Sequence, residues 1–258
     1  MNPGSIHAMI STGQVFKTVG RLLTASFFYS FSLLMFLMTL PIFVDSVCSS
    51  TSTASLAFGI ISAINLLFQF LFLPALGCGA DRFGRKRFLL IATASLFTWC
   101  ALTSLAMNEA TLFFIVVGAM VQGSLGSFYP AAQSMISDKS EEKDRPKFYA
   151  IFQIFGNGIG MIGAFVAAIL VGNGFPVRTP ILLAAFILLL VFIFILALVR
   201  ESLLKMNRKP FSWKRANPVG SLKLFMHTTL IAGTITFFCI VMFAAAVPNY
   251  HLHSFLTR

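Results

Sequence analysis

The stretch GCGADRFGRKR, residues Gly77–Arg87, decides how the rest of the chain is interpreted. An apolar run of membrane-spanning length lies on each side of it. Four cations and one carboxylate fall within its last seven residues. A charge at the bilayer centre costs about 2.5 to 3.5 kcal/mol, so we expect a water-exposed loop here. Gly77 and Gly84 favour a tight reversal, because neither carries a side chain that would hinder close helix approach.

The composition is that of a membrane protein. Of the 258 residues, 57% are hydrophobic and 10% are charged, whereas soluble domains carry about 25% charged residues. The net charge of +11 would suit nucleic-acid binding. The cations are confined to short loops, however, where they set topology rather than bind phosphate. We therefore expect the lipid bilayer as a partner, and no nucleic acid.

Seven apolar runs are long enough to cross a membrane, since about 20 helical residues suffice. Helices are the expected form because they pair all their backbone groups internally. The expected spans are residues 22–44, 54–76, 88–107, 110–136, 148–171, 177–199 and 224–247. The fold class is therefore an all-α polytopic membrane protein. We expect a tail at 1–21, a six-helix bundle at 22–199, a polar central loop at 200–223, and a seventh helix with the C-terminal residues that follow it at 224–258.

The distribution of cations predicts the orientation. With the N-terminus inside, the inner segments hold 17 of the 19 Lys and Arg residues, and Arg178 and Arg258 fall outside. Because short loops rich in Lys and Arg stay in the cytoplasm, we expect a cytoplasmic N-terminus. Seven spans would also fit a receptor or a retinal protein. Those classes place the N-terminus outside, and a retinal protein needs a lysine that the last span does not have.

The spacing G-x-x-x-D-R-x-G-R-K-R between a second and a third span resembles the loop signature of the major facilitator superfamily. The matching residues are Gly77, Asp81, Arg82, Gly84, Arg85 and Lys86. The alternative is a basic loop of another polytopic protein, but the full spacing in this position favours the family. The resemblance implies two six-helix halves that rock around a midplane site. This chain would hold one half, the central loop and one further span, as a fragment, a truncated isoform or an incomplete gene model.

The resemblance also implies a gate at the cytoplasmic end of the bundle. In the family an acidic residue at the end of the fourth span pairs with the loop arginine, so we expect Arg85 to contact Asp138. The alternative is that both charges are solvated, since exposed ion pairs contribute little. Asp81 could accept hydrogen bonds from Arg85 or lie near the positive end of a helix.

Polar side chains recur at helical spacing on several predicted spans. They are Tyr29 on the first, Asn65 and Gln69 on the second, Gln122, Tyr129 and Gln133 on the fourth, and Gln153 and Asn157 on the fifth. Polar groups in hydrocarbon are costly unless paired, so these should face the bundle interior or a water-filled cavity. Two roles stay open for each, cavity lining or hydrogen bonding between helices. The family resemblance favours a substrate cavity for the fourth span.

The chain further resembles the drug/tetracycline-efflux-like branch, with two departures. The stretch Phe211–Phe225 is similar to the central loop of that branch. The fifth span lacks the proline of the glycine-rich element of drug–proton antiporters. The fourth span has Gln122-Gly123 of an R-x-x-Q-G element, with Ala119 in the place of the arginine. No acidic residue lies mid-span, so the coupling ion is left unassigned.

The sequence contains no recognisable pattern of catalytic or metal-binding residues. The four cysteines form no C-x-x-C pair, and we find no nucleophile–base pair or metal-ligand set. We therefore expect no enzyme activity and no cofactor. The predicted function is a carrier for a small-molecule solute. The alternative is a protein of the same fold that senses, scaffolds or regulates without transport.

Overall fold

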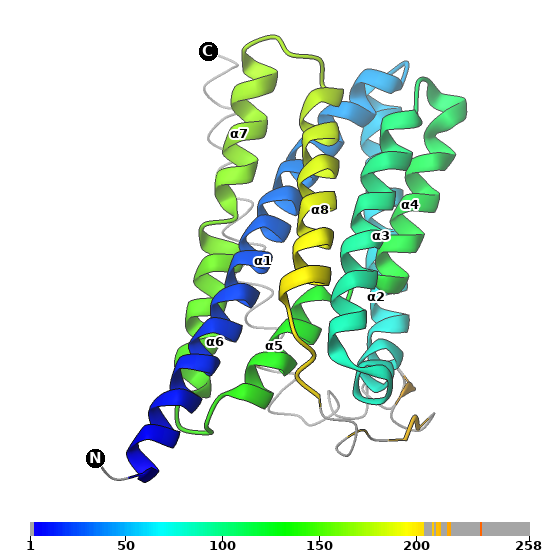
Figure 1. Cartoon of the computed structure of the whole chain (residues 1–258). Helices are drawn as coiled ribbons and strands as arrows, with labels where there is room; N and C mark the ends of the chain where they lie inside the picture. The colour runs from blue at the N-terminus through cyan, green and yellow to red at the C-terminus, as the bar shows by residue number, and fades with distance from the viewer. Residues whose placement is uncertain (1–2, 204–207, 209, 213–215, 218–232, 234–258) are drawn as a thin grey trace. The chain divides into compact units, whose positions relative to one another are not determined.

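The computed structural model describes residues 3–203, 208, 210–212, 216, 217 and 233, with backbone only for residues 3–17 and for Asn157. The chain divides into a unit that ends at Ala216 and a second that begins at Asn217. The first unit holds all the helices described below (Figure 1). The seventh predicted span, 224–247, lies outside the described residues except for Gly233, and so does much of the predicted central loop.

The first unit is a bundle of helices with no strand among its described residues. In chain order it contains α1 (Pro3–Val47), α2 (Thr51–Phe83), α3 (Arg85–Leu105), η1 (Glu109–Thr111), α4 (Leu112–Leu125), α5 (Phe128–Lys139), α6 (Arg145–Gln153), η2 (Ile154–Gly158), α7 (Met161–Gly172) and α8 (Arg178–Leu198). Six stretches are long and apolar enough to cross a membrane: Thr18–Val47, Thr51–Phe83, Arg85–Leu105, Glu109–Lys139, Arg145–Gly172 and Arg178–Leu198. Each overlaps one of the first six predicted spans, so the prediction of an all-α membrane bundle is confirmed.

The stretch at Gly77–Arg87 differs from the predicted loop. Helix α2 continues to Phe83 and α3 begins at Arg85, so Gly84 alone makes the reversal. Its φ of 104° lies in the region that favours glycine. Gly77 lies inside α2, with open space where a Cβ would stand, so its predicted place in the turn was wrong. The reason is that α2, with 33 residues, is about 50 Å long at 1.5 Å per residue and extends beyond a hydrocarbon core of about 30 Å.

Two of the spans are interrupted, although the sequence predicted continuous helices. The fourth span divides at Gly126 and Ser127 into α4 and α5. Pro130 explains the break, because a proline cannot donate to the carbonyl four residues earlier, which is that of Gly126. The fifth span contains the π-helical turn η2, in which the Ile159 N–H donates to the Ile154 carbonyl at 2.9 Å. Such turns add one residue to a helical turn and bend the helix locally.

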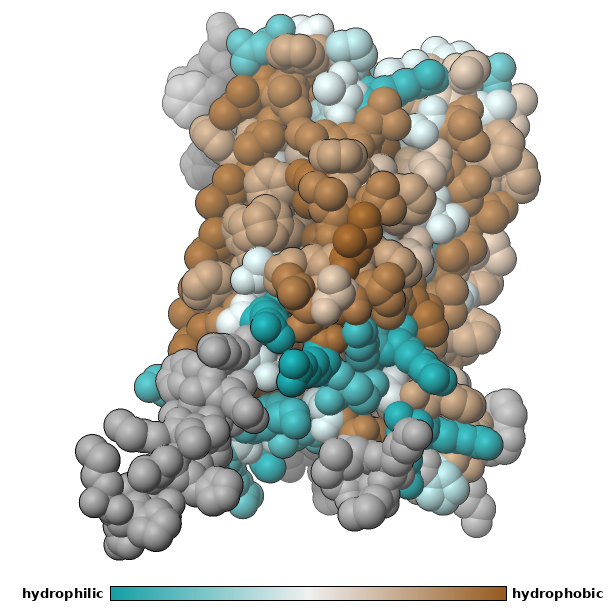
Figure 2. Space-filling model, viewed as in Figure 1, coloured by the Kyte–Doolittle hydropathy of each residue, from teal (hydrophilic) through white to brown (hydrophobic). Residues whose placement is uncertain are grey.

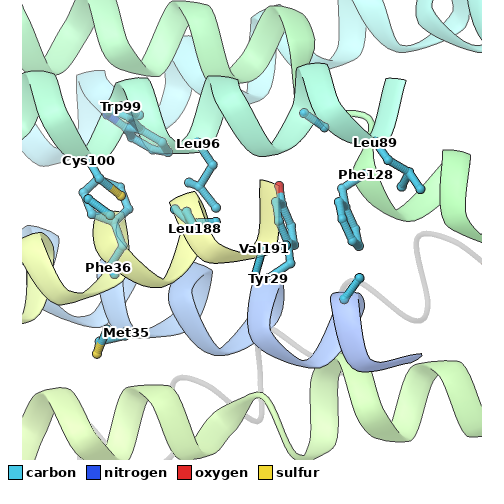
Figure 3. Packing of buried hydrophobic residues seen from close by; sticks show 14 of the residues in the cluster. Tyr29, Met35, Phe36, Leu89, Leu96, Trp99, Cys100, Phe128, Leu188 and Val191 are labelled. Carbon is cyan, nitrogen blue, oxygen red and sulfur yellow. The ribbon is translucent and has the colours of Figure 1, made fainter. Parts of the chain in front are cut away.

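The buried core lies where α1, α3, α5 and α8 meet (Figure 3). Phe36 of α1 meets Trp99 of α3 edge-on, with ring centroids 4.9 Å apart. Trp99 also donates its indole N–H to the Ile115 carbonyl of α4 at 3.1 Å. Gly118 of α4 lies against Trp99, where a Cβ would clash, so this glycine permits the close approach of α3 and α4.

Polar residues gather at the end of the bundle where Gly84 lies, which we call the motif end. Figure 2 shows hydrophobic residues over most of the visible face, with hydrophilic residues at both ends and the larger group of them at that end, at the bottom of the view. Helix α8 buries one face, formed by Ile181, Ala184, Leu188, Val191 and Ile195, and exposes the opposite one. One packed and one exposed apolar face is the pattern of a helix with lipid on its outer side.

Candidate functional site

Arg85 joins three helices at the motif end. Its guanidinium forms an ion pair with Asp138 of α5, with Nη1 and Oδ2 2.5 Å apart. It also donates to the Ser134 carbonyl of α5, and its Nη2 lies 3.5 Å from Oδ1 of Asp81 on α2. Only 13% of the Arg85 side chain is exposed. The expected Arg85–Asp138 contact is therefore present, although its role as a gate stays a prediction.

Glu201, which follows α8, has no site role in the sequence-based prediction. Its Oε1 accepts hydrogen bonds from the backbone N–H groups of Arg85 at 3.0 Å, Ser202 at 3.0 Å and Leu203 at 3.2 Å. Its Oε2 accepts from the N–H of Lys86 at 3.2 Å. The carboxylate thus caps the N-terminus of α3, where a negative charge is favoured by the helix dipole.

Gly84 is required at this cap for a second reason besides its positive φ. A Cβ on Gly84 would collide with the Glu201 carboxylate. The sequence signal for the cap is an acidic residue two positions after the predicted end of the sixth span, and no spacing rule connects it to the start of the third. The cap could therefore be found only in the folded chain.

The two carboxylates are joined by the residue next to Glu201. The Ser202 hydroxyl donates to Oδ2 of Asp138 at 2.8 Å, so Asp138 is shared by Arg85 and Ser202. We call Asp81, Arg85, Asp138, Glu201 and Ser202 the charge cluster. It connects α2, α3, α5 and the segment that follows α8. Charge-assisted bonds of this kind are about twice as strong as neutral ones and fix geometry.

The other cations predicted for the motif lie beside the charge cluster rather than in it. Lys86 donates from Nζ to the Leu196 carbonyl near the end of α8 at 2.8 Å. The Arg82 guanidinium lies over the ring of Phe83, 5.1 Å from its centroid. Lys86 therefore holds α8 against α3, whereas Arg82 is exposed.

Three of the predicted cavity residues make hydrogen bonds between helices. Gln122 accepts from the Ser95 hydroxyl at 2.6 Å through Oε1, and its Nε2 lies 3.4 Å from the hydroxyl of Tyr29. Gln122 is 6% exposed and Tyr29 is 2% exposed. Asn65 donates to the Ala119 carbonyl at 3.0 Å. These side chains tie α1 and α3 to α4, and α2 to α4.

Tyr129 belongs to an aromatic cluster beside the two helix interruptions. Its hydroxyl lies 2.6 Å from Oγ of Ser30 on α1. Tyr29 stacks on Phe128 with centroids 3.9 Å apart (Figure 3). Tyr129 approaches the rings of Tyr29, Phe128 and Phe152 edge-on, at 5.9 to 6.0 Å. The cluster connects α1, α5 and α6.

The remaining predicted cavity residues are more accessible. Gln69 and Gln133 are half-buried and Gln153 is exposed. Asn157 lies in η2, and its side chain is outside the described residues. The assignment of all eight residues to a substrate cavity stays a prediction. In the part of the chain that the structure describes, no group of three or more His, Cys, Asp or Glu residues could hold a metal ion.

Comparison with known proteins decides the family. Residues 22–256 match the model of the Major Facilitator Superfamily. The chain belongs to this family. It is 31% identical to the class C tetracycline resistance protein of Escherichia coli over 209 residues, which are 81% of this chain and 51% of that protein. It is 28% identical to the human Hippocampus abundant transcript 1 protein over 205 residues, 74% of this chain and 38% of that protein.

Solved structures show the same fold. The crystal structure of the human organic anion transporter MFSD10 superposes with a TM-score of 0.63 at 17% identity, covering 76% of this chain and 50% of that one. A peptide transporter POT in complex with sulfate superposes with a TM-score of 0.59 at 20% identity, covering 90% and 46%. The predicted family and its drug/tetracycline-efflux-like branch are confirmed, and the protein is a multi-pass membrane protein. The chain spans about half the length of the E. coli tetracycline resistance protein.

Proposed function

We propose that the described bundle is one half of a carrier that moves a small solute across a membrane by alternating access. The observation that carries the proposal is the charge cluster, in which Asp81 and Arg85 of the family's loop signature bind Asp138 and the segment around Glu201. A carrier of this kind needs no covalent step, because two bundles rock around a site near the bilayer midplane. Relatives named for tetracycline resistance make drug-like organic molecules the first solute class to test.

The charge cluster would serve as the inner gate. Arg85 is held on one side by Asp138 and on the other by the chain around Glu201, so its position is fixed. Asp81 is the more open member, with 40% of its side chain exposed and a 3.5 Å separation from Arg85. A carboxylate held loosely on the surface is free to bind donors on the opposing half. We therefore assign Asp81 the contact that closes the inner side while the carrier is open to the outside.

The substrate cavity would lie on the faces of α2, α5 and α6 that carry Gln69, Gln133 and Gln153. Their side chains are accessible, whereas Tyr29 and Gln122 are enclosed and would support the cavity wall from behind. Tyr129 is half-buried, bonded to Ser30 and edge-on to Tyr29, and would lie between the two sets. The break between α4 and α5 and the π-turn η2 lie beside this wall and give it two places to bend.

The proposed orientation places the motif end and the N-terminus in the cytoplasm. The bias of 17 of the 19 cations toward the inner segments supports it. Tags at Met1 and Arg258 test the orientation with protease added to sealed cells. We expect the first tag to be protected and the second to be cleaved.

Transport is tested by measuring the accumulation of a panel of fluorescent drug-like molecules in cells that lack their own efflux carriers. Cells that express the protein should accumulate less of at least one compound, and Arg85→Gln should remove the difference. If no compound is moved while the protein is present in the membrane, the alternative function, sensing or scaffolding without transport, is favoured instead.

A further inference from the structure

An apolar groove runs between α1 and α8, which lie side by side in the bundle (Figure 1). It encloses about 240 Å³ and is lined by Thr24, Ala25, Phe28, Ile187, Leu190, Val191 and Phe194. The one hydroxyl in the lining, that of Thr24, donates to the Gly20 carbonyl at 3.0 Å. The groove therefore presents hydrocarbon along its length, which is about 10 Å from Ile187 to Phe194 at 1.5 Å per residue.

A guanidinium lies one helical turn beyond the lining of the groove, toward the motif end. Arg21 lies one turn before Ala25 on α1, and its Nη1 donates to the Leu198 carbonyl at 2.9 Å. Leu198 lies one turn beyond Phe194 on α8. Arginine has five N–H donors, so this bond leaves four. Arg200, which is exposed, follows two residues later.

The charges around Arg21 leave it open to an anion. Among the described residues, the ion pairs are Arg85 with Asp81, Arg85 with Asp138, and Lys143 with Glu141, so no carboxylate pairs with Arg21. The Glu201 carboxylate, three residues after Leu198 in the chain, is occupied by four backbone N–H groups. The groove thus combines a hydrocarbon lining with a cation near one end that no carboxylate of the described residues pairs with.

A second groove, on the other side of α8, also has an apolar lining and a cation toward the motif end. It encloses about 170 Å³ between α3 and α8 and is lined by Ala94, Phe97, Leu188, Leu189 and Phe192. Toward the motif end, Lys86 donates to the Leu196 carbonyl. In both cases a cation on the neighbouring helix binds a carbonyl near the C-terminus of α8. At the opposite end of the bundle Arg178 donates to the Ala106 carbonyl and lies over the ring of Phe43, so it is already engaged.

We propose that the groove between α1 and α8 seats an acyl chain of an anionic phospholipid whose phosphate binds Arg21 and Arg200. A guanidinium binds phosphate oxygens in pairs. A lipid seated here would hold the end of α8, which leads directly to Glu201 and so to the cap of α3. The occupant is a lipid of the leaflet at the motif end, whichever compartment that leaflet faces.

The test compares lipids that share acyl chains. The whole chain is delipidated in a neutral detergent and titrated with phosphatidylglycerol or phosphatidylcholine, with bound lipid counted by native mass spectrometry. The unmodified protein should prefer phosphatidylglycerol. Arg21→Gln should weaken phosphatidylglycerol binding about fivefold, since each basic side chain near anionic lipid contributes about 1 kcal/mol, and leave phosphatidylcholine binding unchanged. Arg21→Lys keeps the positive charge and should retain most of the preference for phosphatidylglycerol. This variant can still be measured if Arg21→Gln does not fold.

Two further variants separate the groove from general charge. Lys147→Gln removes the same charge at the start of α6 and should keep the full preference. Ala25→Leu fills the groove, retains both cations, and should weaken the binding of both lipids. The proposal is overturned if Lys147→Gln acts like Arg21→Gln, if the unmodified protein shows no preference, or if glycerol 3-phosphate alone competes as well as the lipid.

Discussion

Glu201 caps the helix that begins with Arg85: its Oε1 accepts the Arg85 N–H at 3.0 Å across a separation of 116 residues. The end of the sixth span is thereby fixed to the start of the third. Because the Arg85 side chain in turn binds Asp138, the position of Arg85 is set by both its backbone and its side chain. A substitution of Glu201 or Asp138 should therefore change the arrangement of the whole charge cluster.

The cap predicts a specific loss of stability. Glu201→Ala should lower the free energy of unfolding by about 1 to 2 kcal/mol, as for other N-terminal caps. Glu201→Gln should cost less, because the amide oxygen still accepts hydrogen bonds and only the charge–dipole interaction of about 0.3 to 1 kcal/mol is lost. Unfolding in detergent, followed by circular dichroism, measures both. Glu142→Ala removes an exposed carboxylate of the loop before α6 and is the control; an equal loss there would contradict the cap.

The reversal at Gly84 predicts an asymmetry between two glycines of the motif. Gly84→Ala should destabilise the protein by more than about 1 kcal/mol, because alanine is strained at positive φ and its Cβ would meet Glu201. Gly77→Ala should be neutral or stabilising by up to about 1 kcal/mol, since Gly77 lies in a helix with open space beside it. The same unfolding measurement compares them. An equal loss of unfolding free energy in the two variants would show that Gly77 is part of the turn.

The ion pair of Arg85 and Asp138 predicts non-additive effects. Asp138→Asn leaves Arg85, whose side chain is 13% exposed, without its partner charge, and Arg85→Gln does the same to Asp138, whose side chain is 23% exposed. The double variant removes both charges, so it should be less destabilised than the sum of the single variants by about 0.5 to 3 kcal/mol. A double-mutant cycle on unfolding free energies gives this coupling directly. Additive effects would mean that the pair behaves as two solvated charges.

The accessibility of the polar residues predicts where thiol reagents can reach. In a background with the native cysteines replaced, Gln133→Cys should react rapidly with a small polar maleimide. Gln122→Cys should react much more slowly, because that position is enclosed and bonded to Ser95 and Tyr29. Leu189→Cys, on the lipid side of α8, should also stay unmodified. Equal rates at the three positions would remove the argument for a water-filled cavity beside α5.

The helical spans were predictable because the lipid environment demands helices and apolar length is visible in any sequence. The ends of the helices were not, since Asp81 and Arg82 continue α2 outside the hydrocarbon core, where hydropathy gives no information. Pro130, four residues after Gly126, indicates the helix break before Phe128. Counting apolar residues over the whole span did not take this proline into account. Spacing rules act along one helix, so they could not find the Glu201 cap or the hydrogen bond between Ser95 and Gln122.

The central claim, a carrier gated by the charge cluster, is tested most directly by solute flux through Asp81→Asn. The protein that contains these 258 residues is reconstituted in sealed vesicles, and uptake of a transported solute is measured per inserted molecule. Arg87→Gln serves as the control because it changes a charge of the same stretch outside the cluster. We expect Asp81→Asn to reduce solute flux about tenfold or more, equivalent to about 1.4 kcal/mol. Membrane insertion of this variant should be unchanged, and the flux through Arg87→Gln should be near that of the unmodified protein. Unchanged flux in Asp81→Asn, or a loss explained entirely by reduced insertion, would contradict it.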